Sequence, residues 1–420
     1  MKWPDQLTPL RERQFAWYYT ARLVSTLGSM MAPVALTFAV LDISNSASAL
    51  GQVLAARTIP LVVFLLFGGV IADRLPRATV MLVSNLLAAL TQGVVAFLVL
   101  SGAAHLWMLI VLEGVNGTVS AFSFPAMASI VAQLAPRSHL RQANALLSFS
   151  RGGLSIIGPT LAALIVVTAG AGWALAFDAV TWLLADACMT RIRLPRRERS
   201  GESQSMLREL REGWSVFVGN TWLWVVVAAF GVLNAIHAGA WFTLGPALAK
   251  NTFGAKGWGY VLSAESLGLL LMTVVMLNVS IRRPLLAGMV GMSLFSVPLL
   301  MLGLDPHVPT LVVAAFVAGA GTEVFSIGWS LAMQENIDDE VLSRAYSYDA
   351  LGSFVAMPVG QIVYGPLGAA FGYRKVLVVS GVVYLAVCLL TLSSRSVRAL
   401  RHPPASELSG ADADAAAVAT

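Results

Sequence analysis

Charged residues are scarce in this chain of 420 residues. Lys, Arg, Asp and Glu together make up 12% of it, where a soluble domain averages about 25%. Hydrophobic residues make up 57% of the chain. So few charges cannot cover the surface of a water-soluble fold of this size, which excludes a soluble globular protein. We therefore expect an integral membrane protein.

Cysteine is also scarce. The chain has two cysteines, Cys188 and Cys388, and each stands alone within an apolar run. Two isolated thiols exclude a disulfide framework and a cysteine metal centre. We interpret both as small apolar packing residues and expect no metal site.

Several functional signatures are missing. The chain has no phosphate-binding glycine loop, no metal cluster, no nucleophile with its base, and no polar region large enough for an ATPase domain. These absences exclude an enzyme and an ATP-driven pump, and no cofactor is expected. The alternating strands of a membrane barrel are absent too, so helices must span the bilayer. The first apolar run has the full length of a span and no cleavage site, which argues against a signal peptide.

Long apolar runs are what the chain does have. A hydrocarbon core of about 30 Å requires about 20 apolar residues per helix, and runs of that length recur along the sequence. They predict an all-α membrane protein with twelve transmembrane helices in two six-helix bundles. The predicted spans are 15 to 41, 48 to 72, 78 to 101, 105 to 133, 140 to 169, 173 to 191, 220 to 249, 256 to 279, 284 to 303, 309 to 336, 342 to 371 and 375 to 394.

The distribution of Lys and Arg predicts the orientation. Of the 27 such residues, Arg22, Arg57 and Arg151 fall within spans, and most others fall on the side that holds both termini. The opposite side holds Lys250, Lys256, Arg374 and Lys375. Because short cytoplasmic loops retain positive charge, we expect cytoplasmic termini and a multi-pass protein of the bacterial plasma (inner) membrane. The basic residues are spread over many loops, which excludes nucleic acid as a partner.

Composition divides the chain into four parts. Residues 1 to 190 form an N-terminal bundle, and residues 191 to 218 are a cytoplasmic linker. Residues 219 to 394 form a C-terminal bundle, and residues 395 to 420 are expected to be a disordered tail. Within the linker, residues 205 to 218 are amphipathic, and we interpret them either as an interfacial helix or as an extended start of span seven. The pairs Gly158-Pro159 and Gly365-Pro366 suggest a weak internal repeat between the two halves.

A charged hinge lies between spans two and three. It contains Gly69, Asp73, Arg74 and Arg77, which match the loop motif of the major facilitator superfamily, while Pro76 and Ala78 depart from it. Topology alone explains the arginines but not the aspartate between them. The chain resembles this superfamily, and the resemblance implies a gating loop that holds the two bundles in one state.

A closer resemblance is to the enterobactin-exporter-like and macrolide-efflux branch. It covers about residues 10 to 395 and is carried by Ala21 to Gly28, Phe124-Pro125-Ala126, Gln142 to Leu146, and Phe177-Asp178-Ala179. Two antiporter signatures are altered. Glu113 stands where an arginine would precede Gly117, and Ala162-Ala163 replace a pair of glycines.

Ionisable residues inside spans cost about 2.5 to 3.5 kcal/mol each on insertion scales, so each calls for a role. Arg57 lies at a depth that favours an ion pair with Glu113 or Asp178, and we interpret this set as structural charge. Arg151 and Asp349 are assigned the same structural role.

Arg22 is followed by Ser25 and Ser29 at helical spacing, which predicts a polar face. In the family that this chain resembles, helix one lines the central cavity, so Arg22 could meet an anionic group of a substrate or influence a carboxylate. An inner-gate salt bridge to Asp349 remains an equal alternative.

Glu265 and Glu323 have no evident basic partner in their half. An unpaired carboxyl group in apolar surroundings can take up and release protons near neutral pH. We therefore predict proton coupling at Glu323 first, followed by Glu113 and Glu265. A permanently protonated Glu323 that donates to a backbone carbonyl is the alternative.

Further cavity residues are expected on helices seven and ten. They are polar or aromatic side chains that suit a large amphipathic ligand, although for His237 the preferred interpretation is a neutral packed polar residue. The set is Asn234, His237, Trp241, Ser326, Trp329 and Ser330.

Together these features predict a secondary active transporter that exports an amphipathic small molecule, such as an antibiotic, siderophore or secondary metabolite, by proton antiport. The expected partners are the small-molecule substrate, protons and membrane lipid, and the expected state is a monomer. The alternatives are a proton-independent facilitator or uptake carrier, and a nontransporting membrane sensor or scaffold.

Overall fold

The computed structural model describes residues 8–74, 77–134, 140–192, 214–215, 217–276, 279, 281–337 and 339–400. Side chains are described in all of these except 65–74, 77–78, 123–129, 132–133, 140–141, 145, 339–340, 343–344 and 347. The described residues are almost entirely helical and contain no strand.

The described part of the N-terminal half starts with a short 3-10 helix, η1 (Thr8–Arg11), and continues with six long helices. These are α2 (Arg13–Ser44), α3 (Ala47–Arg74), α4 (Arg77–Leu100), α5 (Leu106–Leu134), α6 (Leu140–Thr168) and α7 (Ala171–Met189).

In the residues that the structure describes, the C-terminal half also has six spans, three of which are built from consecutive pieces. Its helices are α9 (Thr221–Ile236), η3 (His237–Leu244), α10 (Gly245–Lys250), α11 (Gly254–Met276), α12 (Pro284–Ser293), α13 (Ser296–Leu304), α14 (Val308–Asn336), α15 (Asp339–Phe354), α16 (Met357–Phe371), α17 (Tyr373–Ser393) and α18 (Arg395–Ala399).

Proline accompanies each of the three breaks. Pro298 follows the break between α12 and α13, and Pro358 follows the break between α15 and α16. Proline has no N–H to donate to the carbonyl four residues earlier, so the helix cannot continue unchanged through it. In span seven, Pro246 follows η3, an eight-residue π-helix. A π-helix of this kind is rare and is often found at functional sites.

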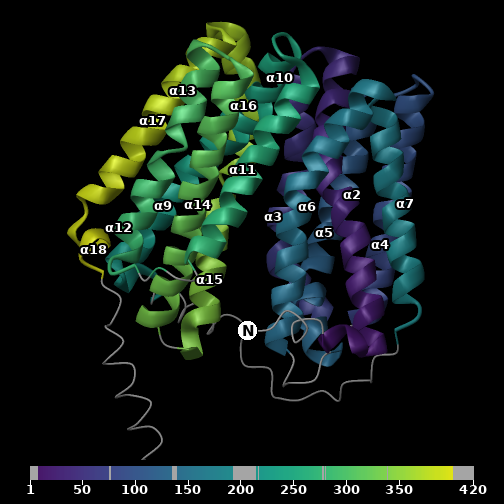
Figure 1. Ribbon diagram of the computed structural model, residues 1–420, viewed down its shortest axis with the longest axis horizontal. Helices are drawn as coiled ribbons and strands as arrows, with labels where there is room; N and C mark the ends of the chain where they lie inside the picture. The colour runs from purple at the N-terminus through teal and green to yellow at the C-terminus, as the bar shows by residue number, and fades with distance from the viewer. Residues whose placement is uncertain are drawn as a thin grey trace, which may run out of the picture.

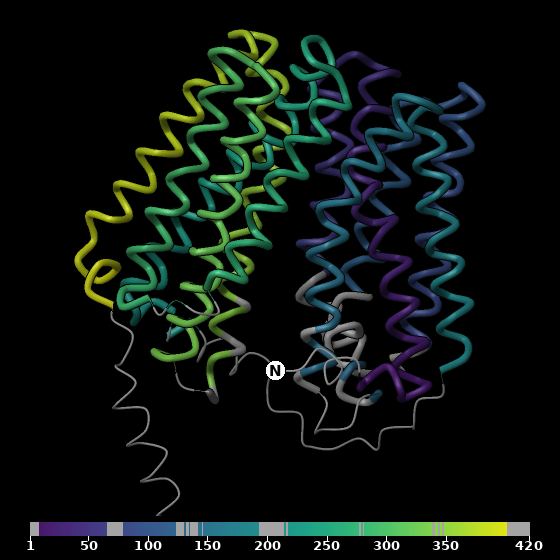
Figure 2. Tube along the Cα trace, viewed as in Figure 1, coloured from purple at the N-terminus to yellow at the C-terminus, as the bar shows by residue number. Residues whose placement is uncertain are grey.

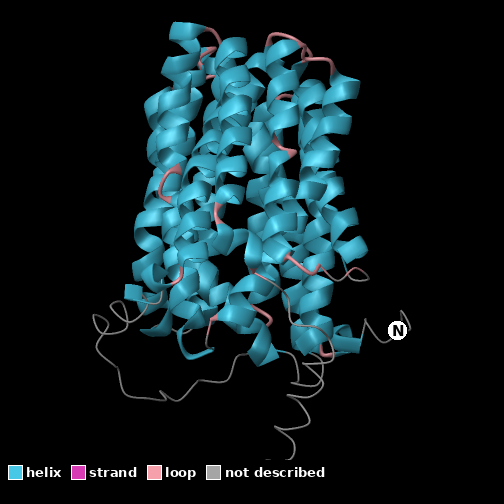
Figure 3. Ribbon diagram, turned by 90° about the vertical axis from the view of Figure 1, so that its left-hand side faces the viewer, coloured by secondary structure: helices cyan, strands magenta, loops and turns pink. Residues whose placement is uncertain are grey.

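The predicted architecture is confirmed. Eleven helices of the described chain are long and apolar enough to cross a membrane, and Leu106–Phe122 of α5 adds a shorter apolar segment. Figure 1 shows α2 to α7 as one bundle and α9 to α18 as another. In the view turned by 90°, the helices run roughly along one common direction (Figure 3). Many large apolar side chains are exposed on the bundle surfaces, with Phe97 and Leu390 each 68% exposed, as contact with lipid requires.

The same kind of close helix crossing occurs within each half. In the N-terminal half, a methyl group on Gly117 of α5 would lie 2.0 Å from the Arg57 carbonyl oxygen on α3. In the C-terminal half, a methyl group on Gly319 of α14 would lie 2.0 Å from the Glu265 carbonyl oxygen on α11. The second and fourth spans of each half therefore cross backbone to backbone at a glycine. This structural repetition agrees with the weak internal repeat in the sequence.

The bundles meet near one end and diverge toward the other (Figure 1). The colour ramp in Figure 2 shows that α2 begins, and α18 lies, at the diverging end. We call this the termini end and the opposite one the distal end. Contacts between the halves are made by α3 with α16 and by α6 with α11, with further contacts of α3 with η3 and of α2 with α10.

The start of the tail differs from the sequence prediction. Residues 395–399 form α18, so the first part of the segment expected to be disordered is helical. Val397 explains the order, because its side chain is fully buried. The remaining tail residues, 401–420, and most of the predicted linker, 193–213, lie outside the described residues. Trp214 and Phe217, at the end of the linker, pack their rings against Tyr348 of α15.

Candidate functional site

A carboxyl group lies between span seven and span eight of the C-terminal bundle. Trp241 Nε1 donates a hydrogen bond to Glu265 Oε2 at 3.0 Å, and His237 Nε2 lies 3.9 Å from Glu265 Oε1. Both His237 and Trp241 belong to the π-helix η3. The widened turn thus presents an imidazole and an indole N–H to the same carboxyl group. Glu265, expected to be unpaired, has a titratable neighbour.

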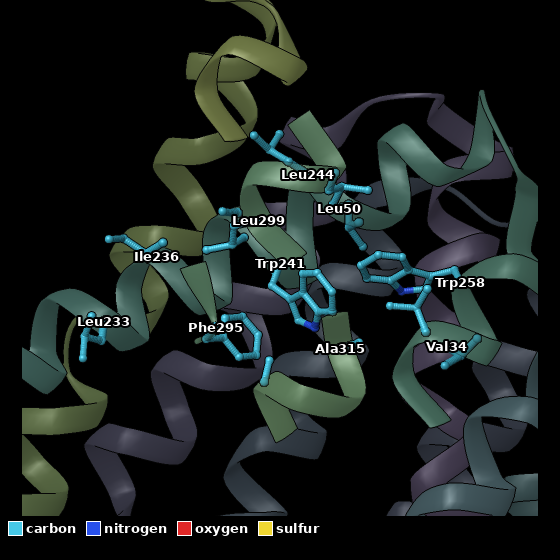
Figure 4. Close-up of a cluster of buried hydrophobic side chains, with 14 of the residues drawn as sticks. Val34, Leu50, Leu233, Ile236, Trp241, Leu244, Trp258, Phe295, Leu299 and Ala315 are labelled. Atoms are coloured by element: carbon cyan, nitrogen blue, oxygen red, sulfur yellow. The ribbon is translucent and has the colours of Figure 1, made fainter. Parts of the chain in front are cut away.

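Aromatic rings surround this group. The His237 ring makes an edge contact with the Phe295 ring, with 4.8 Å between the ring centroids. The Trp241 ring packs against the rings of Phe295 and Trp258, at centroid distances of 5.3 and 4.9 Å. Figure 4 shows Trp241, Trp258 and Phe295 together in the bundle interior. Trp241 was expected in the substrate cavity, but its side chain is fully buried. Its indole N–H therefore holds the Glu265 carboxyl group, and its predicted contact with substrate stays a prediction.

Glu323 lies at a second position along the contact between α11 and α14. Thr273 Oγ1 of α11 donates to Glu323 Oε1 of α14 at 2.7 Å. The Glu323 side chain is half-buried. Glu265 and Thr273 are two helical turns apart on α11, about 12 Å along its axis. The contact between these two helices therefore carries two carboxyl groups, one deep and one partly exposed.

The cavity residues predicted on helix ten divide into two kinds. Ser326 is exposed. Ser330 Oγ donates a hydrogen bond to the Ser326 carbonyl oxygen at 3.0 Å, on an exposed part of the helix. Trp329 is buried instead, and its rings pack against Trp222 and Phe325. The cavity role of the two serines stays a prediction, whereas the tryptophan belongs to the core.

Asp349 is held within the C-terminal bundle. Its carboxyl oxygens accept hydrogen bonds from Trp329 Nε1 at 3.0 Å and from Ser353 Oγ at 3.1 Å. Asn234 of α9 donates to the Ser353 carbonyl oxygen at 2.9 Å. The sequence left open a salt bridge between Asp349 and Arg22, and in this structure both oxygens of Asp349 have partners in their own bundle. Asn234 thus contacts α15 of the same bundle, and its predicted cavity role stays a prediction.

The N-terminal bundle contains the expected charge cluster. Arg57 Nη1 of α3 lies 3.7 Å from Glu113 Oε2 of α5, whose side chain is fully buried. Arg57 also lines a small cavity with Asp178 of α7 and with Ser29 of α2. The cavity measures about 30 Å³, enough for one or two water molecules. Ser29 was predicted beside Arg22 but faces this separate internal cavity.

Several oxygens of this cluster are buried without a hydrogen-bond partner. They include both carboxyl oxygens of Glu113, Asp178 Oδ1 and Gln92 Oε1. Buried polar atoms are usually hydrogen-bonded to protein or to ordered water. The cluster is therefore compatible with internal water. Within the described residues no group of three His, Cys, Asp or Glu side chains suits a metal ion.

Arg22 and Arg151 line a larger cavity between α2, α5 and α6. It measures about 240 Å³ and is partly open. Arg22 is half-buried, and Arg151, which was expected to be structural, is exposed. Ser25 is buried at 3% exposure and donates to the Arg22 carbonyl oxygen at 3.4 Å. The Ser25 hydroxyl group therefore bonds the backbone of its own helix, and Ser25 is not among the residues that line this cavity.

The gating-loop residues Gly69, Asp73, Arg74 and Arg77 fall among the residues whose side chains are not described. Their predicted role stays a prediction.

Close packing joins the halves at the distal end. A methyl group on Gly51 of α3 would lie 1.9 Å from the Gln361 carbonyl oxygen of α16. Ser263 Oγ of α11 donates to the Ile156 carbonyl oxygen of α6 at 2.7 Å. Lys250 Nζ lies 2.8 Å from Asp42 Oδ1. The structure is thus closed at the distal end.

Sequence reasoning missed Asp42, Thr273, Ser263 and Ser353 as partners of functional groups. Each is a common polar residue, and hydroxyl groups in helices usually bond their own backbone. Asp42 and Lys250 carried a usable signal, because they have opposite charges and both lie at predicted connections on the side opposite the termini.

Comparisons with known proteins agree with this geometry. The sequence profile described as Major Facilitator Superfamily matches residues 18–352. The chain is 22% identical over 409 residues to macrolide efflux protein A of Streptococcus pyogenes, covering 92% of this chain and 97% of that protein. It is 25% identical over 370 residues to the multidrug efflux pump Tap of Mycolicibacterium fortuitum, covering 84% of this chain and 88% of that protein.

Solved structures share the fold. The nucleoside transporter NupG superimposes with a TM-score of 0.70 at 13% identity, over 90% of this chain and 98% of that chain. A POT family transporter in complex with a thioalcohol-conjugated peptide gives a TM-score of 0.70 at 12% identity, over 91% and 96%.

Proposed function

The chain belongs to the Major Facilitator Superfamily, and from this premise we propose that it exports an amphipathic small molecule by proton antiport. The cargo is an antibiotic, a siderophore or another secondary metabolite. The relatives that carry efflux names over most of this chain support export. The two bundles move against each other and expose a central site to either side in turn.

The observation that carries the coupling mechanism is the pair of carboxyl groups on the contact between α11 and α14. Glu323 and Glu265 lie within apolar spans, and no Lys or Arg of the described residues lies within ion-pair distance of either. Keeping such a group ionised within the bilayer is costly, and proton binding removes the cost. Protonation therefore lowers the free-energy cost of keeping these two residues in the bilayer during a conformational change.

Glu323 is the first candidate for the proton carrier, because its side chain is half-buried and can exchange protons with water. Glu265 lies deeper, beside His237, and is a candidate for a second step. Glu113 is the weaker candidate, since Arg57 already neutralises it. Asp73 and the neighbouring arginines of the predicted gating loop act on the equilibrium between states in this proposal.

The orientation follows from the positive charges. With both termini in the cytoplasm, the distal end faces outward. The structure then corresponds to a state that is closed to the outside, in which the cargo enters from the cell interior.

Two measurements test the proposal. A growth-inhibition panel with and without expression of this chain identifies a cargo, and proteoliposomes then report its movement under an imposed pH gradient. We expect gradient-driven accumulation that stops when the gradient is collapsed. Glu323→Gln should lose this accumulation while equilibrium binding of the cargo persists.

The matched control is Glu12→Gln, which removes an exposed carboxyl group at the start of α2. It should transport as the unaltered protein does. Export that continues after collapse of the gradient would identify a proton-independent carrier. If no compound on the panel moves, and neither Glu323→Gln nor Arg22→Gln alters any flux, the chain is a sensor or scaffold.

A further inference from the structure

The cavity between α2 and α6 has an unusual charge. Arg22 and Arg151 both line it, and none of the described residues that line it is acidic. Neither arginine has an ion pair among the described residues. Two cations that share a partly enclosed space repel each other, and the repulsion grows as water is excluded. The positive charge of this cavity is therefore not neutralised by any described residue that lines it.

Topology does not explain these arginines. Arg22 follows the start of α2 by nine residues and Arg151 follows the start of α6 by eleven, which places them about 14 and 17 Å along the helix axes. Loop charges that set orientation lie outside the hydrocarbon region or at its edge. Charged side chains within a span are usually retained for contacts inside the bundle or with a cavity.

The rest of the lining is amphipathic. Hydroxyl groups of Thr26 and Ser148 stand beside the arginines, and Leu147 and Leu154 supply apolar surface. Tyr18 and Tyr19 add aromatic rings from α2. Arginine presents several N–H donors in a plane that matches a carboxylate or a related oxyanion. Apolar and aromatic walls favour a ring or hydrocarbon body attached to that anion.

The size of the cavity limits what it holds. Ligand pockets usually measure about 300 to 1,000 Å³, and this cavity measures about 240 Å³. It accommodates one end of a ligand, namely the anionic group with one or two rings. The partly open side leaves room for the remainder.

We propose that this cavity binds the anionic end of the exported molecule, so that the cargo is an amphipathic anion held by Arg22 and Arg151. This inference rests on the proposed export function and narrows its substrate class. It also gives Arg151, on the face of α6 toward α2, a binding role in place of a structural one.

The test is equilibrium binding to the full-length protein in nanodiscs of zwitterionic lipid, with empty nanodiscs as blank. The probes are 2-naphthoate and 2-naphthylmethylammonium, which share a ring system and carry opposite charges. We expect saturable binding of naphthoate and none of the ammonium probe. Arg22→Gln and Arg151→Gln should each weaken naphthoate binding roughly tenfold or more, as loss of a charge-assisted hydrogen bond predicts.

The lysine variants separate charge from folding. Arg22→Lys and Arg151→Lys should retain part of the affinity, and thermal unfolding of every variant should match the unaltered protein within a few degrees. Arg282→Gln, an exposed arginine outside the cavity, is the matched control and should bind normally. Equal affinity for both probes, or naphthoate binding that survives both glutamine variants, overturns the proposal.

A lipid headgroup offers the same anionic chemistry and is distinguished by a second arm. Nanodiscs that contain phosphatidylglycerol should bind naphthoate as well as the zwitterionic ones do. If the anionic lipid displaces naphthoate, the cavity is a lipid site and the cargo assignment is wrong. Because binding needs no gradient, naphthoate binding alongside failed proton coupling would contradict only the antiport mechanism.

Discussion

The side chain of Lys250 joins the two bundles at the distal end. Its Nζ atom lies 2.8 Å from Asp42 Oδ1 and donates to the Leu41 carbonyl oxygen at 2.7 Å. Lys250 ends α10 in the C-terminal half, whereas Asp42 and Leu41 belong to α2. One ammonium group therefore bridges the halves where they are closed, and it must lose both partners when the distal end opens.

Lys250→Met should shift the protein toward the state that is open at the distal end. Partly exposed ion pairs contribute about 0.2 to 1 kcal/mol, so we expect a change in the ratio of states between about 1.4-fold and about fivefold. Spin labels at Ala103→Cys and Phe371→Cys, both exposed, report the separation of the two halves by pulsed electron resonance. Lys256→Met, which removes a lysine from the same side, is the control. An unchanged distance distribution would show that the bridge has no part in closure.

Ser263→Ala should weaken the same closure independently. Its hydroxyl group donates to the Ile156 carbonyl oxygen across the halves at 2.7 Å, and a net hydrogen bond contributes about 0.5 to 1.5 kcal/mol. The spin-label distances should shift in the same direction as for Lys250→Met, and the two effects should add. Ser293→Ala is the comparison, because that hydroxyl group bonds within its own helix. A shift as large in this comparison variant would rule out a specific effect of the contact.

Gly319→Ala should destabilise the C-terminal bundle. The added methyl group would lie 2.0 Å from the Glu265 carbonyl oxygen, so α11 and α14 must separate, at about 1 to 3 kcal/mol for overpacking. Thermal unfolding in detergent measures the loss. Gly153→Ala is the matched control, since a methyl group there meets nothing within 4 Å. Equal unfolding temperatures for both variants would contradict the close crossing.

Arg57→Gln should destabilise the N-terminal bundle, because Glu113 is fully buried and Arg57 is its ion-pair partner at 3.7 Å. Removal of one member of a buried pair costs about 3 to 5 kcal/mol, and the partial exposure of Arg57 reduces this to roughly 1 to 3 kcal/mol. Adding Glu113→Gln should restore most of the unfolding temperature. A double variant no more stable than Arg57→Gln alone would show that the pair is not coupled.

The number of spans and most of their limits could be predicted from the sequence. The predicted span 284 to 303 corresponds to α12 and α13 together, and 140 to 169 corresponds to α6. The breaks within spans were not predicted, although Pro298 and Pro358 mark two of them. Proline in a membrane helix is compatible with either a kink or a break, and neighbouring helices decide between them.

The candidate site was only partly accessible to sequence reasoning. The ionisable residues were found because a charge in an apolar run is conspicuous. Their partners were not found, as Trp241 and Thr273 illustrate, because whether two side chains meet depends on the rotation of two helices about their axes. Ser25 and Ser29 lie one helical turn apart and still have different surroundings.

The sequence by itself determined that this chain crosses a membrane in two sets of six helices, because the hydropathy of each segment is a local property that the bilayer tests segment by segment. Only the tertiary structure decided that Arg22 and Arg151 share a cavity, that His237 faces Glu265 from a π-helix, and that Lys250 bridges the halves. These relationships arise from crossings of helices far apart in the chain, and packing among all twelve helices fixes them together.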